Sequence, residues 1–333
     1  MSAKLSASFL SPFLTFFYFC LFFCFSFLSF LFYMHSYLVS FFLSRTNIRA
    51  AIVSEDGTIK CMKKSESHPE RGAEAVMETM ISLIESLDGY EECEGIGMGI
   101  PGPIDTINGK IIVSTNLPKL IGFPIAEYIE NHFHKPTYMD NDVKVAALGE
   151  AVQGAGKDYP IVYYVTISTG VGGALVIDQK VIGGQNGHAG EIGNICIDRN
   201  REKYNILNVG AVENEASGTA VTRKGKAVFG DKINHAGDVF DLARSGDEQA
   251  LKIVDDMAYD LAMMFCAIGH IIDPHVFVVG GGVMKGKDVF FEKMESYYRS
   301  MIHVGMQPVV FKEALLDEPG IIGAAMLPMT HLK

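Results

Sequence analysis

An Asn-Asp pair ahead of an Ala-rich stretch is the first place where this sequence could do chemistry. Asn141 and Asp142 follow a short apolar run, and the residues after them predict a helix that continues to about Val152. Asp is favoured at a helix start because unpaired backbone N–H groups and the helix dipole stabilise its ionised form. Asp142 is therefore either only an N-cap or a carboxylate at the edge of a cleft that accepts a proton from a substrate hydroxyl.

A glycine-rich turn between two predicted strands could hold a phosphate. The strands span residues 161–168 and 174–177, and the turn between them contains Thr169, Gly170, Gly172 and Gly173. Glycines let the backbone approach a phosphate closely, and the N–H groups and neighbouring hydroxyls can donate hydrogen bonds to it. The alternative is an ordinary hairpin turn without a ligand.

Two loop glutamates and a second glycine cluster extend this set. Glu191 and Glu213 lie in polar stretches punctuated by glycines, and each is either a ligand for a polar substrate or a solvated surface residue. A predicted buried strand over residues 276–279 runs directly into Gly280, Gly281 and Gly282. Such a strand end lets the backbone reach a nucleotide, which larger residues would prevent.

Strands and helices at regular intervals must position these residues. The pattern predicts strands over 47–53 and 58–61 joined by an Asp-Gly turn, and helices over 72–87, 125–133, 142–152 and 248–268. The alternation of strands and helices, with glycines at strand ends, indicates an α/β architecture. The glycine string at 95–103 is weak evidence for a dinucleotide, because Pro101 and Pro103 stand where the binding helix would begin.

The composition limits the classes of function. The chain has 333 residues, which is enough for two domains, and its net charge of −11 argues against nucleic acid as the main partner. Six cysteines are scattered without a CxxC pair or a Cys/His cluster. They predict neither a disulfide scaffold nor a zinc knuckle, and they indicate a reducing compartment.

The first 44 residues differ sharply from the rest. They contain one basic residue, Lys4, and no acidic residue, and residues 9–43 are nearly continuous Phe, Leu, Ser, Tyr and Cys. This run exceeds the roughly 20 residues that span a bilayer. It is either a membrane anchor or a segment foreign to the fold. Basic residues after the run predict a cytoplasmic protein, either free or attached to the membrane through residues 9–43.

In order, these motifs resemble those of the ROK family of sugar kinases and related repressors, over about residues 46–325. The family's fold is the actin-like, ribonuclease-H-like pair of α/β lobes. The resemblance implies an N-terminal lobe of residues 45–140 with 317–333 and a C-terminal lobe of residues 141–316. The hydrophobic segment 1–44 would precede them.

The resemblance also implies a role for each motif. Asp142 would be the catalytic base, and Asn141, Glu191 and Glu213 would bind the sugar. Nucleotide-binding residues would be Thr46, Thr169, Gly170, Gly172, Gly173, Gly280, Gly281 and Gly282. The resemblance further implies ATP and Mg²⁺ as cofactors, a hexose as substrate and a homodimer as the assembly.

Two positions depart from the family pattern. Where the family usually has His followed by a Cys-rich zinc loop, this chain has Asn194, and residues 195–209 contain only Cys196. We therefore expect no structural zinc, with Asn194 taking over the sugar contact through its amide. The family's first phosphate loop, Asp-x-Gly-Gly-Thr, aligns with residues 42–46, where Phe42 replaces the Asp that helps to organise Mg²⁺.

Two functions of different classes follow from these expectations. The first is ATP-dependent phosphorylation of a hexose hydroxyl, the 6-OH of glucose or a related sugar. The second is a sugar-binding protein of the same family without turnover, which the altered first phosphate loop favours. A DNA-binding repressor is not indicated, because residues 1–44 lack the basic residues and polar helix faces of a helix-turn-helix.

Overall fold

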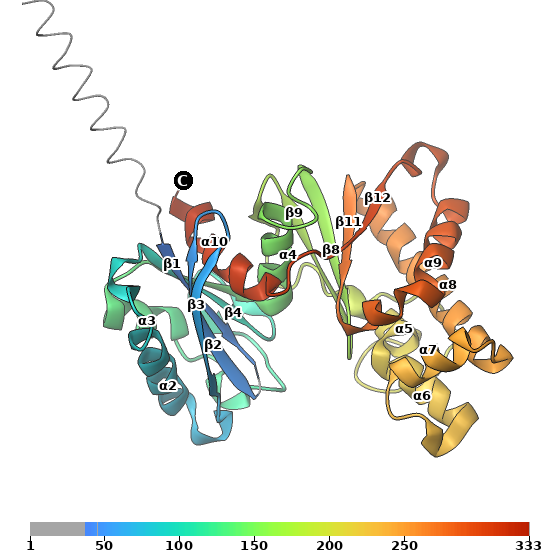
Figure 1. Cartoon of the computed structure of the whole chain (residues 1–333), viewed down its shortest axis with the longest axis horizontal. Coiled ribbons are helices and arrows are strands. Elements are labelled where there is room, and N and C mark those ends of the chain that lie inside the picture. Colours follow the sequence, from blue (N-terminus) through green and yellow to red (C-terminus); the bar gives the residue numbers. More distant parts are fainter. Residues whose placement is uncertain (1–36, 45, 333) are drawn as a thin grey trace, which may run out of the picture. The chain divides into compact units, whose positions relative to one another are not determined.

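The described part of the chain contains two five-stranded sheets, each accompanied by helices (Figure 1). A computed structural model describes residues 37–44 and 46–332. Arg45 and residues 1–36, which include most of the predicted membrane segment 9–43, lie outside the described residues. Of the helices that are described, none combines the length and the hydrophobicity needed to cross a membrane.

The first sheet has the strand order β3–β2–β1–β4–β7, with β1 antiparallel to β2 and parallel to β4. Helices α2 and α3 pack on one face of this sheet and α10 on the other (Figure 1). The elements are β1 (Tyr37–Leu43), β2 (Asn47–Ser54), β3 (Ile59–Glu66), β4 (Gly95–Ile100), β7 (Thr137–Asn141), α2 (Ala73–Glu85), α3 (Ile125–Phe133), α10 (Pro319–Leu332) and a short ribbon of β5 (Ile104–Asp105) and β6 (Lys110–Ile111).

Strand β1 corrects the boundary expected at residue 44. Apart from Ser40, its residues are apolar without alternation, which suits a strand buried on both faces. Val39, Phe41 and Leu43 are 0% exposed and face α2 and α3, and Leu38 packs on the α10 side. The end of the hydrophobic run is therefore the middle strand of the first sheet. Interpreting residues 37–43 as foreign to the fold or as membrane segment was wrong.

The second sheet has the strand order β10–β9–β8–β11–β12. Strands β8 and β9 form an antiparallel hairpin, and β11 is parallel to both β8 and β12. The elements are β8 (Ile161–Ile167), β9 (Val171–Ile177), β10 (Lys180–Val181), β11 (Val276–Gly280), β12 (Val310–Glu313), α5 (Val212–Ala216), α6 (Gly218–Phe229), α7 (Ala236–Arg244), α8 (Glu248–Ile272) and α9 (Lys287–Met301).

Helix α4 (Asp142–Val152) matches the predicted helix 142–152 and packs against α10. A Cβ atom on Gly323 of α10 would lie 1.6 Å from the carbonyl oxygen of Val145, so the two backbones are in direct contact. One apolar cluster joins α4 and α10 to residues of both sheets, among them Leu38 and Val162. The helix that begins at Asp142 is thus fixed to both sheets.

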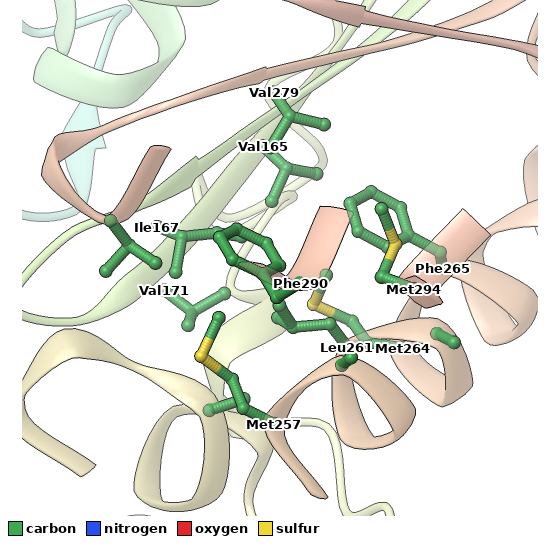
Figure 2. Packing of buried hydrophobic residues seen from close by; sticks show 14 of the residues in the cluster. Val165, Ile167, Val171, Met257, Leu261, Met264, Phe265, Val279, Phe290 and Met294 are labelled. Carbon is green, nitrogen blue, oxygen red and sulfur yellow. The ribbon is translucent and has the colours of Figure 1, made fainter. Parts of the chain in front are cut away.

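The core beside α8 anchors the hairpin that carries the glycine-rich turn. Figure 2 shows Ile167 and Val171, which flank this turn, in one cluster with Met257 and Leu261 of α8. Ile167 and Leu261 are fully buried and Val171 is 6% exposed. The turn therefore projects from a packed base, which limits the movement of its backbone.

Candidate active site

Asn141, not Asp142, caps helix α4. The Asn141 Oδ1 atom accepts hydrogen bonds from the backbone N–H groups of Val143 at 3.0 Å and Lys144 at 3.3 Å. Its Nδ2 atom donates to the carbonyl oxygen of Gly102 at 3.0 Å. Asp142 is the first residue of the helix, and the interpretation of Asp142 as the N-cap is wrong. Because Asn141 does the capping, the Asp142 carboxylate is not committed to that role.

The Asp142 carboxylate lies in a place that opposes its ionisation. Burial raises the pKa of Asp142 above its ordinary value, hydrogen bonding from the Val143 N–H lowers it in part, and the charge of Glu191 raises it further. The Val143 N–H lies 3.0 Å from the Asp142 Oδ1 atom. A carboxylate whose charge is poorly solvated gains more from accepting a proton, which suits a general base.

A cavity of about 750 Å³ contains Asp142 and most of the residues that the sequence predicted to bind sugar. Elements of both sheets line it. Its lining includes Phe42, Pro101, Gly102, Thr115, Asn116, Asn141, Asp142, Lys144, Thr166, the run 168–173, Gly190, Glu191 and Glu213. The structure thus brings together Asn141, Asp142, Glu191 and Glu213, which are far apart in the sequence.

Glu213 connects the predicted sugar side of this cavity to the glycine-rich turn. It lies on the short helix α5, and its Oε2 atom accepts a hydrogen bond from the Val171 N–H at 2.9 Å. A Cβ atom on Gly170 would lie 2.4 Å from the same Oε2 atom. Glycine at position 170 therefore allows the carboxylate to sit directly against the turn.

Asn194 lies apart from the other predicted sugar contacts. It ends the short 3-10 helix η4 (Ile192–Asn194) and does not line the cavity. Its Oδ1 atom accepts a hydrogen bond from the Asn208 N–H at 2.7 Å. In this conformation the Asn194 side chain holds the following loop.

The glycine-rich turn is shorter than the sequence predicted. It comprises residues 168–170, closed by a hydrogen bond from the Ser168 N–H to the Gly170 carbonyl oxygen at 2.8 Å. Gly172 and Gly173 belong to strand β9, which the sequence placed three residues later. Both still line the cavity, and the Gly173 N–H donates to the Gly190 carbonyl oxygen at 3.2 Å. A Cβ atom on Gly190 would lie 2.1 Å from the Gly173 carbonyl oxygen, so glycine at position 190 lets the loop before Glu191 approach the strand.

A second cavity, of about 960 Å³, lies on the other side of the same turn and shares Ser168 and Thr169 with the first. Four basic side chains and one acidic side chain line it, which favours an anionic ligand. The lining consists of Ser168, Thr169, Gly218, Thr219, Thr222, Arg223, Lys226, Asn234, His235, Ala236, Gly237, Phe240, Asp241, Arg244, Gly282, Val283 and Lys285.

Sequence reasoning found few residues of this second cavity. Of the three predicted glycines, only Gly282 lines it. Gly280 is the last residue of strand β11. Gly281 has a φ of 94°, and a Cβ atom at this position would lie 2.3 Å from the carbonyl oxygen of Ile167. Helices α6 and α7 supply most of the missed side chains. One sequence feature that could have indicated α6 is Ser217, a residue type favoured as an N-cap. Its side chain accepts a hydrogen bond from the Ala220 N–H at 3.1 Å, and the first residues of α6, Gly218 and Thr219, line the cavity.

Phe42 and Thr46 are the first and last residues of the segment that aligns with the family's first phosphate loop. The Phe42 ring lines the first cavity and fits against Gly99 and Gly320, with the Arg49 guanidinium 5.0 Å from the ring centre. Thr46 is exposed, lines neither cavity and accepts a hydrogen bond from the Asn47 Nδ2 atom at 2.8 Å. An aromatic side chain thus occupies the cavity wall where the family pattern has Asp.

Metal binding at this site depends on the donor side chains that the chain provides. Among the residues that the structure describes, no three His, Cys, Asp or Glu side chains are grouped to hold a metal ion. The loop 195–209 offers one thiol, Cys196, and no imidazole, which does not fit a structural zinc site. Phe42 cannot hold a metal-bound water. Mg²⁺ is usually held by one or two carboxylates together with substrate phosphates.

The family model of the ROK family matches residues 42–330, and the chain belongs to this family. A glucokinase from Thermotoga maritima is 29% identical over 307 residues, covering 87% of this chain and 96% of that protein. A ROK hexokinase structure from Thermus thermophilus has a TM-score of 0.80 at 28% identity, covering 89% of this chain and 99% of the other.

A ROK family glucokinase from Streptomyces griseus, solved in complex with glucose and AMPPNP, has the same fold. Its TM-score is 0.71 at 24% identity, covering 88% of this chain and 99% of the other. The fold is therefore the actin-like ATPase fold of the ROK kinases, which confirms the prediction from the sequence motifs.

Proposed function

We propose that this protein transfers the γ-phosphoryl group of ATP to a hexose hydroxyl, the 6-OH of glucose or a closely related sugar. The observation that carries the proposal is the position of Asp142. It shares one cavity with Glu191, Glu213 and the turn at residues 168–170, and a second, basic cavity begins on the far side of that turn. The glucokinases among its relatives support the same reaction class.

The sugar would lie in the first cavity. The carboxylates of Glu191 and Glu213 can accept hydrogen bonds from sugar hydroxyls, and charged acceptors form the stronger hydrogen bonds. The Asn141 Nδ2 atom, which donates one N–H to Gly102, can donate its second N–H to the sugar. Asn194 would contact the sugar only after exchanging its hydrogen bond with the Asn208 N–H. We therefore assign the larger share of sugar recognition to the two glutamates.

Asp142 would act as the general base. The carboxylate accepts the hydroxyl proton while the sugar oxygen forms a bond to the γ-phosphorus and the bond to the leaving oxygen of ADP breaks. Because such transfer has a loose transition state, positioning of the oxygen and the phosphoryl group contributes most of the rate. The N–H groups of the turn can donate to the phosphate oxygens.

The nucleotide would occupy the second cavity. Arg223, Lys226 and Lys285 can neutralise phosphate charge, whereas Arg244 is already paired with Asp241 and Asp288. The start of α6 presents helix N–H groups to an anion. Mg²⁺ would enter with ATP and would neutralise charge that develops on the phosphate groups during transfer. No carboxylate at position 42 assists it in this chain.

Phe42 supports a second function, sugar binding without turnover. Its ring lines the cavity where the family pattern places a carboxylate. A protein with this change could retain the two sugar-binding glutamates and lose phosphoryl transfer. The two functions differ in one observable property, which is the release of ADP.

The deciding experiment measures ADP release from the full chain with Mg-ATP, alone and with glucose, mannose, fructose, allose and N-acetylated hexosamines. Release that depends on a sugar supports the kinase and names its substrate. Calorimetric binding of a sugar without ADP release would overturn the kinase in favour of the binding protein. In that case Phe42→Asp, with Phe42→Leu as control, tests whether one carboxylate restores turnover.

A further inference from the structure

The loop of residues 195–209 contains no helix or strand, yet Arg201 ties it to the protein interior. The Arg201 guanidinium binds both oxygens of Asp260 on α8, at 2.8 Å each, and the Oε2 atom of Glu215 on α5 at 2.9 Å. Its Nε atom also donates to Asp198 in the same loop at 3.3 Å. One side chain thus joins the loop, α5 and α8.

The two partners outside the loop are deeply buried carboxylates. Glu215 is 3% exposed and Asp260 is 1% exposed, and Lys224 on α6 is the second cation near them, 3.1 Å from Glu215. Burial raises the pKa of Asp260, while hydrogen bonding from Arg201 lowers it. The guanidinium therefore gives two carboxylates a cationic hydrogen-bonding partner where water cannot solvate them. Lys224, with a single ammonium group, cannot replace its planar donor set.

Helix α5 depends on these contacts for its position. It has only five residues, too few to be stable alone. Glu213 presents its carboxylate to the first cavity, while the next two residues are buried and bonded to the loop. Asn214 exchanges two amide hydrogen bonds with Asn205, at 2.9 and 3.0 Å, and Glu215 binds Arg201.

The same loop also reaches the second cavity. The guanidinium of Arg223, which lines that cavity, lies 3.7 Å from the centre of the Tyr204 ring. Arg223 donates in turn to the Asn214 carbonyl oxygen at 2.6 Å. Arg201 therefore anchors a loop that also contacts Arg223, a residue of the second cavity, through Tyr204.

We propose that the Arg201–Glu215–Asp260 ion cluster does here what a structural metal ion does elsewhere: it fixes the loop 195–209 and positions Glu213 for the sugar. This inference rests on the proposed sugar site. The loop has a single thiol, Cys196, and no imidazole, which is too few donors for a zinc site. The cations beside these carboxylates are the side chains of Arg201 and Lys224. Arg201 is thus a positioning residue that acts through α5.

The test compares Arg201→Met and Arg201→Lys with the unchanged chain. We expect the KM for the sugar to rise about tenfold or more in Arg201→Met, because displacement of a binding group by about 1 Å is costly. The KM for ATP should change much less. Arg201→Lys should give an intermediate value, and it decides the question if Arg201→Met does not fold.

Arg299→Met is the matched control. Arg299 on α9 also joins a carboxylate, Glu295, to loop carbonyl oxygens, but it lies in neither cavity. It should lower the melting temperature without changing the KM for the sugar. An unchanged sugar KM in both Arg201 variants would overturn the proposal. So would one zinc ion per chain in the purified protein.

Failure of the proposed function would be visible separately. If the unchanged chain binds a sugar without turnover, the kinase is excluded, and the same variants are then compared by their Kd for that sugar. A Kd that rises in the Arg201 variants and not in Arg299→Met still supports the positioning role. A chain that binds no sugar overturns both proposals.

Discussion

The Glu213 carboxylate accepts a hydrogen bond from the Val171 N–H, with 2.9 Å between the Oε2 atom and the nitrogen. Val171 directly follows the turn at residues 168–170, so the residue proposed to bind the sugar also contacts the segment proposed to bind phosphate. The proposed sugar site and the proposed phosphate site are therefore connected through one carboxylate. Sugar binding and the position of the turn should respond together when Glu213 is changed.

Replacing Glu213 with Gln tests the sugar contact while leaving the contact with the turn in place. The amide can still accept from the Val171 N–H, but it lacks the charge that strengthens hydrogen bonds to sugar hydroxyls. Loss of a charged hydrogen bond costs about 2 kcal/mol, which corresponds to a rise of roughly thirtyfold in the KM for the sugar. Steady-state kinetics measure this rise. Glu248→Gln, at the exposed start of α8, should change nothing, and an unchanged sugar KM in Glu213→Gln would refute the assignment.

Replacing Asp142 with Asn should remove the general base and keep the shape of the cavity. Because a positioned base contributes about 10²- to 10⁴-fold, kcat should fall by a factor in this range. The affinity for the sugar should stay within a few-fold, since the amide retains hydrogen-bonding groups. A variant that keeps more than a tenth of the original kcat would contradict the assignment of Asp142.

The pH dependence of kcat should report the environment of Asp142. Its pKa is raised, first by burial and in part by the charge of Glu191, and only the ionised form accepts a proton. Activity should therefore decline on the acidic side, with an apparent pKa above the ordinary value of 3.8. Glu191→Gln removes a charge that raises this pKa, so the acidic limb should move to lower pH. A limb that stays in place or moves upward would contradict this interaction.

Regular periodicity made several elements of this fold predictable. The helix predicted over residues 125–133 is α3, and the one over 142–152 is α4. The long helix 248–268 extends four residues further, to Ile272. In α3 and α8 the apolar residues recur at helical spacing, because one face of each helix packs on the core. Helix α4 was predicted instead from the Ala-rich stretch after the Asn-Asp pair, and seven of its eleven residues are buried. The cavity residues Asp142, Glu191 and Glu213 were singled out by their places in short motifs, and their proposed roles came from the resemblance of those motifs to the ROK family.

The features that the sequence did not predict depend on contacts between residues that are far apart in the chain. A continuous apolar run gives no period, so the strand Tyr37–Leu43 could not be separated from the hydrophobic residues before it. The bond between Arg201 and Asp260 spans 59 residues, and neither residue belongs to a motif. The side chains of α6 and α7 in the second cavity also come together only in the folded chain.

Lys144→Met should loosen the segment before Glu191. Lys144 is 3% exposed, and its ammonium donates to the carbonyl oxygens of Gly187 at 2.7 Å and Gly183 at 3.5 Å. Met has a similar length but no donor. We expect the free energy of unfolding to fall by about 2 kcal/mol and the KM for the sugar to rise. Denaturant titration and kinetics check both effects.

The exposed pair of Lys252 and Asp256 supplies the control for this change. Lys252→Met should alter the unfolding free energy by less than about 1 kcal/mol, since exposed ion pairs contribute little. If Lys144→Met resembled Lys252→Met in stability and in sugar KM, the ammonium of Lys144 would not be what holds this segment.

Gly323→Ala tests the contact that fixes the helix of Asp142. Helix propensity alone favours Ala over Gly by about 0.5–1 kcal/mol. The added Cβ atom, however, would lie 1.6 Å from the Val145 carbonyl oxygen and 2.7 Å from the Gly149 nitrogen, so α10 and α4 must separate. Overpacking of this kind typically costs 1–3 kcal/mol or more. The steric cost should therefore exceed the gain in helix propensity. Gly323→Ala should lower the free energy of unfolding by about 2 kcal/mol and should also lower kcat.

Gly305→Ala is the control, because the nearest atom to its Cβ would be 3.7 Å away. Equal stability of the two variants in denaturant titration would mean that α4 and its Asp142 can shift without cost.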